Sequence, residues 1–231
     1  MAEKLMPLTG HLDELRSRLI KMIGSVSVGF FLCYFFSERI ISLLQAPLNL
    51  PLVFIAPTEA FLTNLKVAFF SGIGLAYPII GYQWWAFIRP GLKENERSHA
   101  VWLFTLGPLL FCLGSAFAYW GVLPLGIKFL LSFKTASLVP MLTLNEYISF
   151  CLLMIVAFGL IFNLPLAVVI LARIGIITPA RMRSSRKYAV LIIFVLAALL
   201  TPPDVFTQTM MALPLLLLYE VSIWLAGKTG K

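Results

Sequence analysis

Long apolar runs separated by short polar segments divide this chain into six candidate membrane-spanning helices. A helix needs about 20 apolar residues to cross a bilayer, and most of the runs reach that length. Backbone groups in hydrocarbon must pair within their own segment, which favours helices throughout. The pattern therefore predicts an all-α integral membrane protein, a single domain over residues 1–231, with spans at about residues 19–36, 61–88, 100–123, 147–172, 188–200 and 205–226.

The segment before the first apolar run has the pattern of an amphipathic helix. Its leucines recur on one helical face, while most of its polar side chains fall off that face. Such a helix rests in the membrane interface. Basic residues beside a span hold it on the cytoplasmic side, but Asp13 and Glu14 need another explanation. They indicate a surface that meets a cation as well as anionic lipid.

The last two apolar runs are unusual. The fifth has only about 13 clearly apolar residues before Pro202 and Pro203, roughly 20 Å of helix against a ~30 Å hydrocarbon core. A short hairpin of this kind either thins the bilayer locally or lies tilted among its neighbours. Prolines inside the spans can kink their helices and favour a concave wall; they are Pro78, Pro108, Pro165 and Pro214.

Composition and charge support a membrane protein and give it an orientation. The chain is 60% hydrophobic and 12% charged, too apolar for a soluble fold of 231 residues. Of its 18 Lys and Arg residues, 14 flank the spans on the side of the two termini. This bias predicts cytoplasmic N- and C-termini and accounts for the net charge of +8 without nucleic-acid binding. The first apolar run is expected to remain as a span and not to be cleaved as a signal peptide.

Two segments on the opposite side are expected to form structured caps, because they contain prolines and are not rich in Gly and Ser. They cover residues 37–58 and 124–145. The three cysteines lie in apolar runs without metal-ligand spacing, which favours buried apolar side chains over a metal site or disulfide.

Motifs for enzymatic chemistry are missing from the sequence. The two histidines, His11 and His99, lie at the cytoplasmic edge, and neither HExxH, GxSxG nor a phosphate-binding loop occurs. No enzyme, cofactor or metal is therefore expected. The alternative function is a small-solute secondary transporter, for which Lys66, Asn163 and Gln208 would supply the polar site.

The cytoplasmic acids form two clusters, one before the first span and one after the second. Carboxylates at a membrane surface can bind arginine through paired, charge-assisted hydrogen bonds. They can equally pair within the chain, Glu14 with Arg18 at i,i+4 and Glu96 with Lys93 at i,i+3. The spacing by itself favours internal pairing.

Several motifs, taken in order, carry a resemblance to a known family. They are HLDELRSR at residues 11–18, APL at 46–48, PTE at 57–59, QWWAFI at 83–88, RPGLKENER at 89–97, TPPDVFTQ at 201–208, ALP at 212–214 and LYE at 218–220. Together these segments, spread over nearly the whole chain, resemble the TatC family, the multispanning subunit of the twin-arginine protein translocase.

The resemblance implies a receptor in the cell inner membrane. Such a receptor recognises signal peptides with two adjacent arginines and exports folded proteins using the proton-motive force. It implies Glu14 and Glu96 as the arginine-recognition acids. Residues matching the same surface are Leu15, Arg16, Phe87, Pro90 and Arg97. The implied partners are single-span TatA and TatB subunits and further copies in the receptor complex.

Five positions are candidates for partner contacts or intramembrane polar contacts, and one of them departs from the family. The positions are Pro47, Asn163, Asp204, Gln208 and Glu220, of which Glu220 can equally lie near the cytoplasmic headgroups. The segment FGLIFNLP at 158–165 has Asn163 where the family commonly has glutamate. Asparagine can only donate and accept hydrogen bonds, so a role in protonation is in question there, and a bond between spans is an equal alternative.

Overall fold

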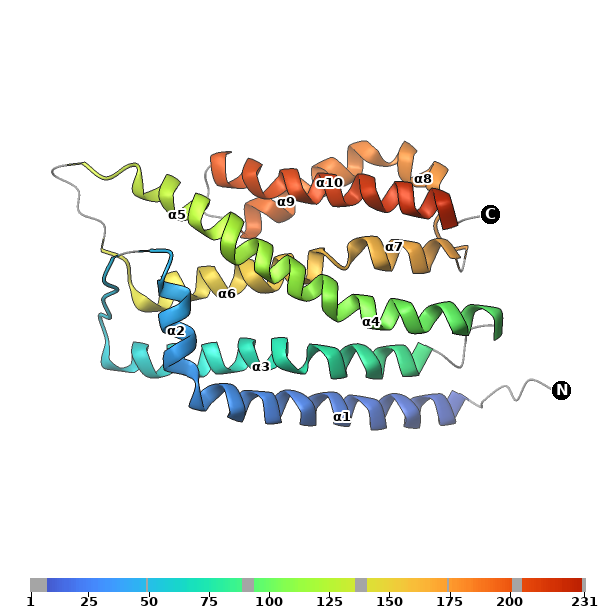
Figure 1. Ribbon diagram of the computed structural model, residues 1–231, viewed down its shortest axis with the longest axis horizontal. Helices are drawn as coiled ribbons and strands as arrows, with labels where there is room; N and C mark the ends of the chain where they lie inside the picture. Colours follow the sequence, from blue (N-terminus) through green and yellow to red (C-terminus); the bar gives the residue numbers. More distant parts are fainter. Residues whose placement is uncertain are drawn as a thin grey trace. The chain divides into compact units, whose positions relative to one another are not determined.

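Nearly all of the described chain is helical in the computed structural model (Figure 1). The structure describes residues 8–48, 50–88, 94–135, 141–173, 175–200 and 205–229; of these, the side chains of 8–11, 88, 94–105, 173 and 229 are outside the description. The helices are α1 (Leu8–Phe35), α2 (Ser37–Gln45), α3 (Pro57–Ile88), α4 (Glu94–Phe117), η2 (Ala118–Val122), α5 (Leu123–Leu131), α6 (Leu144–Ile161), α7 (Leu164–Arg173), α8 (Pro179–Ser184), α9 (Arg186–Leu200) and α10 (Val205–Thr229).

The predicted all-α membrane fold is confirmed. Within the described residues, five helical stretches are long and apolar enough to cross a membrane: Leu12–Phe35, Pro57–Phe87, Leu106–Leu131, Leu144–Ala172 and Val205–Lys228. The predicted short fifth span corresponds to α9, whose 15 residues are fewer than a full crossing needs. The count of six spans, the cytoplasmic termini and the concave wall stay predictions.

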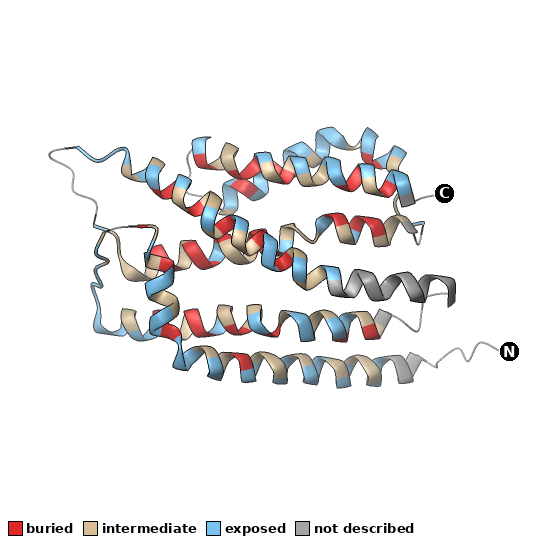
Figure 2. Ribbon diagram, in the orientation of Figure 1, coloured by how far each residue is buried: buried red, intermediate tan, exposed pale blue. Residues whose placement is uncertain are grey.

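Many large apolar side chains point outward, as lipid-facing helices require. Phe35 is 82% exposed, Trp120 75% and Leu199 74%. Figure 2 shows exposed positions interspersed with buried ones along the helices. In water such a surface would be unfavourable by about 25 cal/mol for each Å² of exposed apolar area, which a bilayer removes.

Contacts divide the chain into two compact units. The first contains residues 1–39 and 64–108; the second contains residues 40–63 and 109–231. The prediction of a single domain stays a prediction.

In the first unit, α1 and α3 run side by side in opposite directions (Figure 1). Two glycines allow the approach, because a Cβ atom on Gly29 would lie 2.6 Å from the carbonyl oxygen of Gly72. A Cβ on Gly72 would lie 2.6 Å from the backbone nitrogen of Phe30. Close backbone approach at small residues is the usual way in which membrane helices pack.

The glycine contact also sets the register of the two helices. Arg18 lies 11 residues before Gly29, and Gln83 lies 11 residues after Gly72. Eleven residues make about three turns of an α-helix, so both side chains return to the facing sides of the antiparallel pair. The register fixed at the glycines therefore brings Arg18 opposite Gln83.

In the second unit, two tyrosines hold the end of α2. Tyr119 donates from its hydroxyl to the carbonyl of Leu43, and Tyr147 donates to the carbonyl of Leu44, both at 2.8 Å. The last carbonyls of a helix lack intrahelical partners, and the tyrosines supply them. The predicted structured cap at residues 37–58 is confirmed in its described part.

The segments at residues 37–58 and 124–145 are joined by backbone and side-chain bonds. Val53 donates to the carbonyl of Leu142 at 3.1 Å and accepts from Leu144 at 2.8 Å. The Glu59 carboxylate accepts from the backbone nitrogens of Ile55 at 2.9 Å and Asn145 at 3.0 Å. Glu59 thus ties residues before α3 to the start of α6.

Removing the Glu59 carboxylate is expected to loosen this cap. Glu59→Gln keeps one acceptor oxygen and Glu59→Ala keeps none, so the unfolding temperature in detergent should fall in the order wild type, Gln, Ala. Cleavage by added protease near residues 50–56 should accelerate in the same order. Glu146→Gln, an equal charge change on an exposed side chain nearby, is the matched control. Equal unfolding temperatures for all four proteins would contradict the prediction.

The predicted continuous helix at residues 147–172 is interrupted. The α6 helix ends at Ile161 and α7 begins at Leu164, with Phe162 and Asn163 forming a turn. Pro165 lacks a backbone N–H and its ring would clash with the carbonyl of residue 161 in a regular helix. The helix breaks there, where the sequence predicted only a kink, although the stretch is still long and apolar enough to cross a membrane.

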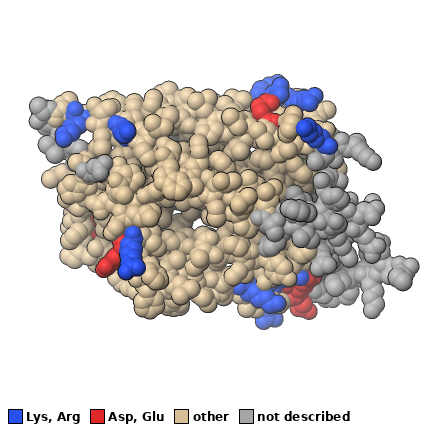
Figure 3. Space-filling view, in the orientation of Figure 1, with Lys and Arg blue, Asp and Glu red and all other residues tan. Residues whose placement is uncertain are grey.

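Helices α7, α8 and α10 share a small apolar cluster made of Val168, Met182, Ile223 and Ala226. The chain turns after α7 at Gly175, whose φ of 76° favours glycine. Thr178 caps α8 by accepting from the backbone nitrogen of Arg181. Tyr219 then donates from its hydroxyl to the carbonyl of Met182 at 3.0 Å. Basic side chains lie in the last turns of α8 and α10, and Figure 3 shows basic groups on this part of the surface.

Candidate functional site

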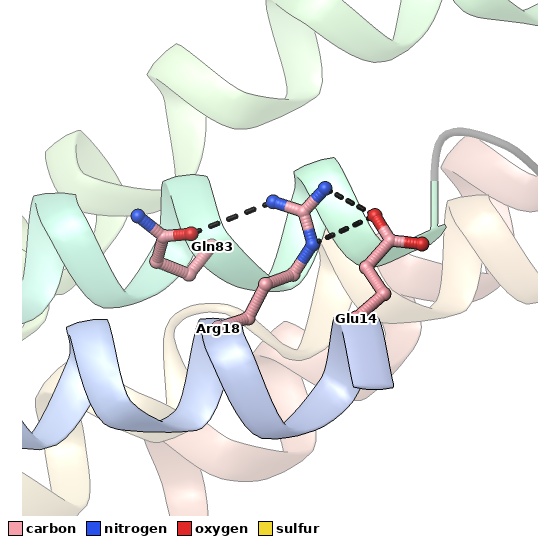
Figure 4. Close-up of polar contacts among 3 residues, drawn as sticks. All are labelled: Glu14, Arg18 and Gln83. Atoms are coloured by element: carbon pink, nitrogen blue, oxygen red, sulfur yellow. Dashed lines mark hydrogen bonds and ion pairs between the residues drawn. The ribbon is translucent and has the colours of Figure 1, made fainter. Parts of the chain in front are cut away.

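Glu14, in α1, is the best-defined part of the predicted arginine-recognition site (Figure 4). Arg18 donates from Nε to Oε1 of Glu14 at 3.0 Å, and its Nη2 contacts the same oxygen. The i,i+4 spacing on a helix places the two side chains together. This confirms the internal pair that the spacing favoured.

Arg18 also reaches the neighbouring helix. Its Nη1 donates to Oε1 of Gln83, in α3, at 3.4 Å. Gln83 is buried, with 9% of its surface exposed. One guanidinium therefore bridges an acid on its own helix and an amide on the next.

The two oxygens of the Glu14 carboxylate differ in their hydrogen bonding. The exposed fractions of the Arg18 and Glu14 side chains are 20% and 21%. Oε1 accepts both contacts from Arg18, whereas Oε2 is buried and accepts no hydrogen bond from the described residues. A carboxylate can accept a guanidinium at both oxygens, so Glu14 keeps unused capacity for a cation.

The other predicted site residues are only partly placed. On α1, Leu15 is half-buried and Arg16 is exposed; Phe87 is half-buried in the last turn of α3. Phe87 lies four residues after Gln83 and therefore on the same helical face. Pro90 and the side chains of Glu96 and Arg97 lie outside the described residues, so the meeting of Glu14 with Glu96 stays a prediction.

Gln83 was not predicted from the sequence, although it lies in the quoted motif at residues 83–88. An amide close to the end of a long apolar run is a detectable signal, because a buried amide needs a hydrogen-bond partner. What the sequence lacks is the register of α1 and α3, which identifies that partner.

Comparison with known proteins places the chain in a family. The family model described as "Sec-independent protein translocase protein (TatC)" matches residues 10–214. The chain belongs to the TatC family.

TatC proteins from several bacteria are similar over nearly the whole chain. The one from Carboxydothermus hydrogenoformans is 44% identical over 230 residues, which cover 98% of this chain and 95% of that protein. The one from Aquifex aeolicus is 42% identical over 227 residues, covering 95% and 94%. A solved structure, "Crystal Structure of Twin Arginine Translocase Receptor- TatC", matches with a TM-score of 0.86 and 41% identity, covering 95% of this chain and 99% of that one. The predicted family is confirmed, and the chain is a multi-pass membrane component of a protein translocase.

Two intramembrane amides of this TatC chain make local bonds. Asn163 donates from Nδ2 to the carbonyl of Gly159 at 2.9 Å, within its own helical stretch, at the break before Pro165. Gln208, in α10, donates from Nε2 to the carbonyl of Phe194, in α9, at 3.0 Å. Gln208 thus stabilises the hairpin of the two C-terminal helices, and Asn163 satisfies a carbonyl near the missing proline donor.

The remaining predicted contact positions are exposed, half-buried or outside the described residues. Glu220 is exposed and pairs with Nη2 of Arg186 at 2.7 Å, each side chain being 52% exposed. An exposed pair of this kind stabilises a protein by at most about 1 kcal/mol. Pro47 is half-buried just after α2. Asp204 lies outside the described residues.

Proposed function

We propose that this TatC-family chain is the receptor for signal peptides that carry two adjacent arginines, and the core of the machinery that exports their folded proteins. The observation that supports this most strongly is its near full-length similarity to the solved structure of the twin arginine translocase receptor TatC. The proton-motive force would drive transport, and no covalent chemistry is involved.

Recognition would rest on carboxylates near the membrane surface. The planar guanidinium of a signal arginine fits a carboxylate through two parallel hydrogen bonds, which lysine cannot form. Glu14 would bind one arginine and Glu96 the other. Leu15, Phe87 and Pro90 would contact the apolar part of the signal, and Arg16 and Arg97 would balance the charge around the two acids.

The site requires a defined orientation and partners. Six spans, with α9 as the short fifth, would place both termini in the cytoplasm of a cell whose inner membrane holds the protein. Single-span TatA and TatB subunits would pack against the spans and the outer cap near Pro47, Asn163, Asp204, Gln208 and Glu220. Several copies would associate in the receptor complex.

Site-specific crosslinking tests the recognition step. A precursor with a photoreactive residue beside its arginine pair should crosslink to membranes containing the wild-type chain, together with TatB. Crosslinking should be lost with the double variant Glu14→Ala and Glu96→Ala, because both carboxylates are removed. The same precursor with two lysines is the control for arginine specificity.

Undiminished crosslinking to the double variant would refute the proposal. Equal crosslinking of the arginine and lysine precursors to the wild-type chain would refute the guanidinium-specific contact.

A further inference from the structure

We propose that Arg18 is a built-in occupant of the arginine site, which the incoming signal arginine must displace from Glu14, and that Gln83 receives the displaced guanidinium. The inference rests on the proposed function, because it assigns a role to Arg18 only if Glu14 binds a signal arginine. It makes Arg18 a competitor that sets the affinity of the site.

The first support is chemical identity. The group that Glu14 binds in the free protein is a guanidinium, the same group that a signal arginine presents. Both of its contacts go to one oxygen, Oε1, and leave Oε2 without a hydrogen bond from the described residues. A guanidinium that contacts both oxygens in parallel gains a geometry that Arg18 does not use here.

The second support is the position of Gln83. Its amide oxygen already accepts from Nη1 of Arg18, at a distance of 3.4 Å that is long for a hydrogen bond. If Arg18 moved off Glu14 without another acceptor, a mostly buried cation would lose its partner at a considerable energetic cost. Shortening the contact with Gln83 would offset part of that cost.

The third support is that Gln83 is held in place. It is buried on α3, whose register against α1 is fixed by the close approach at Gly29 and Gly72. Arg18, by contrast, is a long side chain with several rotatable bonds and one-fifth of its surface exposed. The backbone position of the acceptor is fixed by packing, while the long Arg18 side chain can reach a second acceptor by a change of rotamer.

Displacement has a measurable consequence. In the displacement model, a ligand of Glu14 must take Oε1 from Arg18, so the competing pair weakens all such ligands by the same factor. Removing Arg18 should therefore tighten binding of a strong and a weak ligand equally. An orienting role for Arg18 would produce the opposite result, because Glu14 would lose its geometry.

The test is a binding titration with the full chain in lipid nanodiscs. The probe is a fluorescent synthetic peptide with two adjacent arginines followed by an apolar segment, and its matched peptide has two lysines. Arg18→Gln should lower the Kd of both peptides by about three- to tenfold, the net size of one ordinary hydrogen bond. Lys21→Gln, the same charge change at an exposed position on α1, should change the Kd by less than about twofold.

A double-mutant cycle isolates the role of Gln83. Gln83→Leu alone should raise the Kd by about two- to fivefold, since Arg18 then has no second acceptor. In the Arg18→Gln background the same substitution should have no effect. Arg18→Lys, which keeps the charge without the planar fork, should give a Kd between those of wild type and Arg18→Gln.

Two outcomes separate the inference from the function on which it rests. If Glu14→Gln leaves the binding of the arginine peptide unchanged, the proposed function fails. The unfolding temperature of Arg18→Gln serves to show that this variant is folded. If Glu14→Gln abolishes binding, but folded Arg18→Gln binds the peptide equally well or more weakly than wild type, only the displacement model is overturned. Additive effects of Arg18→Gln and Gln83→Leu would likewise overturn it.

Discussion

Glu14→Gln is expected to weaken the binding of a twin-arginine signal peptide by about 10- to 100-fold. The substitution would keep the shape of the side chain but remove its charge and one acceptor oxygen. Hydrogen bonds to charged groups contribute about 1.5–3 kcal/mol, and each 1.4 kcal/mol changes a Kd tenfold. The burial of Glu14, four-fifths of its side chain, limits the compensation by water. A fluorescence anisotropy titration in nanodiscs measures the change.

The adjacent acid supplies the control for that result. Asp13→Asn makes the same charge change one residue earlier on α1, but Asp13 is exposed and points about 100° away around the helix. Its effect should stay within about twofold, because an exposed charge is screened. An equal loss for Asp13→Asn and Glu14→Gln would mean that the signal responds to general negative charge and not to Glu14.

Gly29→Ala is expected to destabilise the protein by about 3 kcal/mol, a large effect for the addition of a single methyl group. That methyl carbon would lie 2.6 Å from the backbone carbonyl oxygen of Gly72. No flexible side chain can move aside there, so α1 and α3 must separate or slide. Loss of helical circular dichroism on heating in detergent gives the unfolding midpoint, which should fall clearly.

Gly24 offers a matched control on the same helix. It is exposed, and a Cβ atom added to it would meet nothing within 4 Å. Gly24→Ala should therefore leave stability unchanged or raise it by up to about 1 kcal/mol, since alanine favours a helix more than glycine does. Of these two identical substitutions, only Gly29→Ala is thus expected to lower the stability. A similar midpoint for both variants would contradict the close packing of α1 and α3.

The register of α1 against α3 connects the two predictions. Arg18 meets Gln83 because each lies the same number of residues from the glycine contact. A shift of α1 along α3 in Gly29→Ala would separate that pair while leaving the Glu14–Arg18 pair intact, because those two residues share one helix. In the Gly29→Ala background, adding Gln83→Leu is therefore expected to leave the Kd of the peptide unchanged.

The helices of this protein were largely determined by sequence-local effects. The predicted spans at residues 61–88, 188–200 and 205–226 correspond to α3, α9 and α10 with boundaries that differ by a few residues at most. Apolar run length and the prohibition of unpaired backbone in hydrocarbon are properties of the segment itself. The Glu14–Arg18 pair was predictable for the same reason, since four residues make about one helical turn. Pro165 was recognised as a disturbance, but whether it would kink or break the helix was not.

The contacts between distant segments were decided only by the tertiary structure. Nothing in the sequence pairs Arg18 with Gln83, Glu59 with Asn145, or Tyr147 with the carbonyl of Leu44, because each contact depends on how two helices or loops are placed in three dimensions. In a membrane protein, helix packing is especially hard to predict from the sequence. Lipid and protein interiors are equally apolar, so the hydrophobic pattern does not tell which helix face meets a neighbouring helix. The sequence thus determined the family, the helices and the Glu14–Arg18 pair. The packing of α1 against α3 decided that Arg18, which is paired with Glu14 on its own helix, also reaches Gln83.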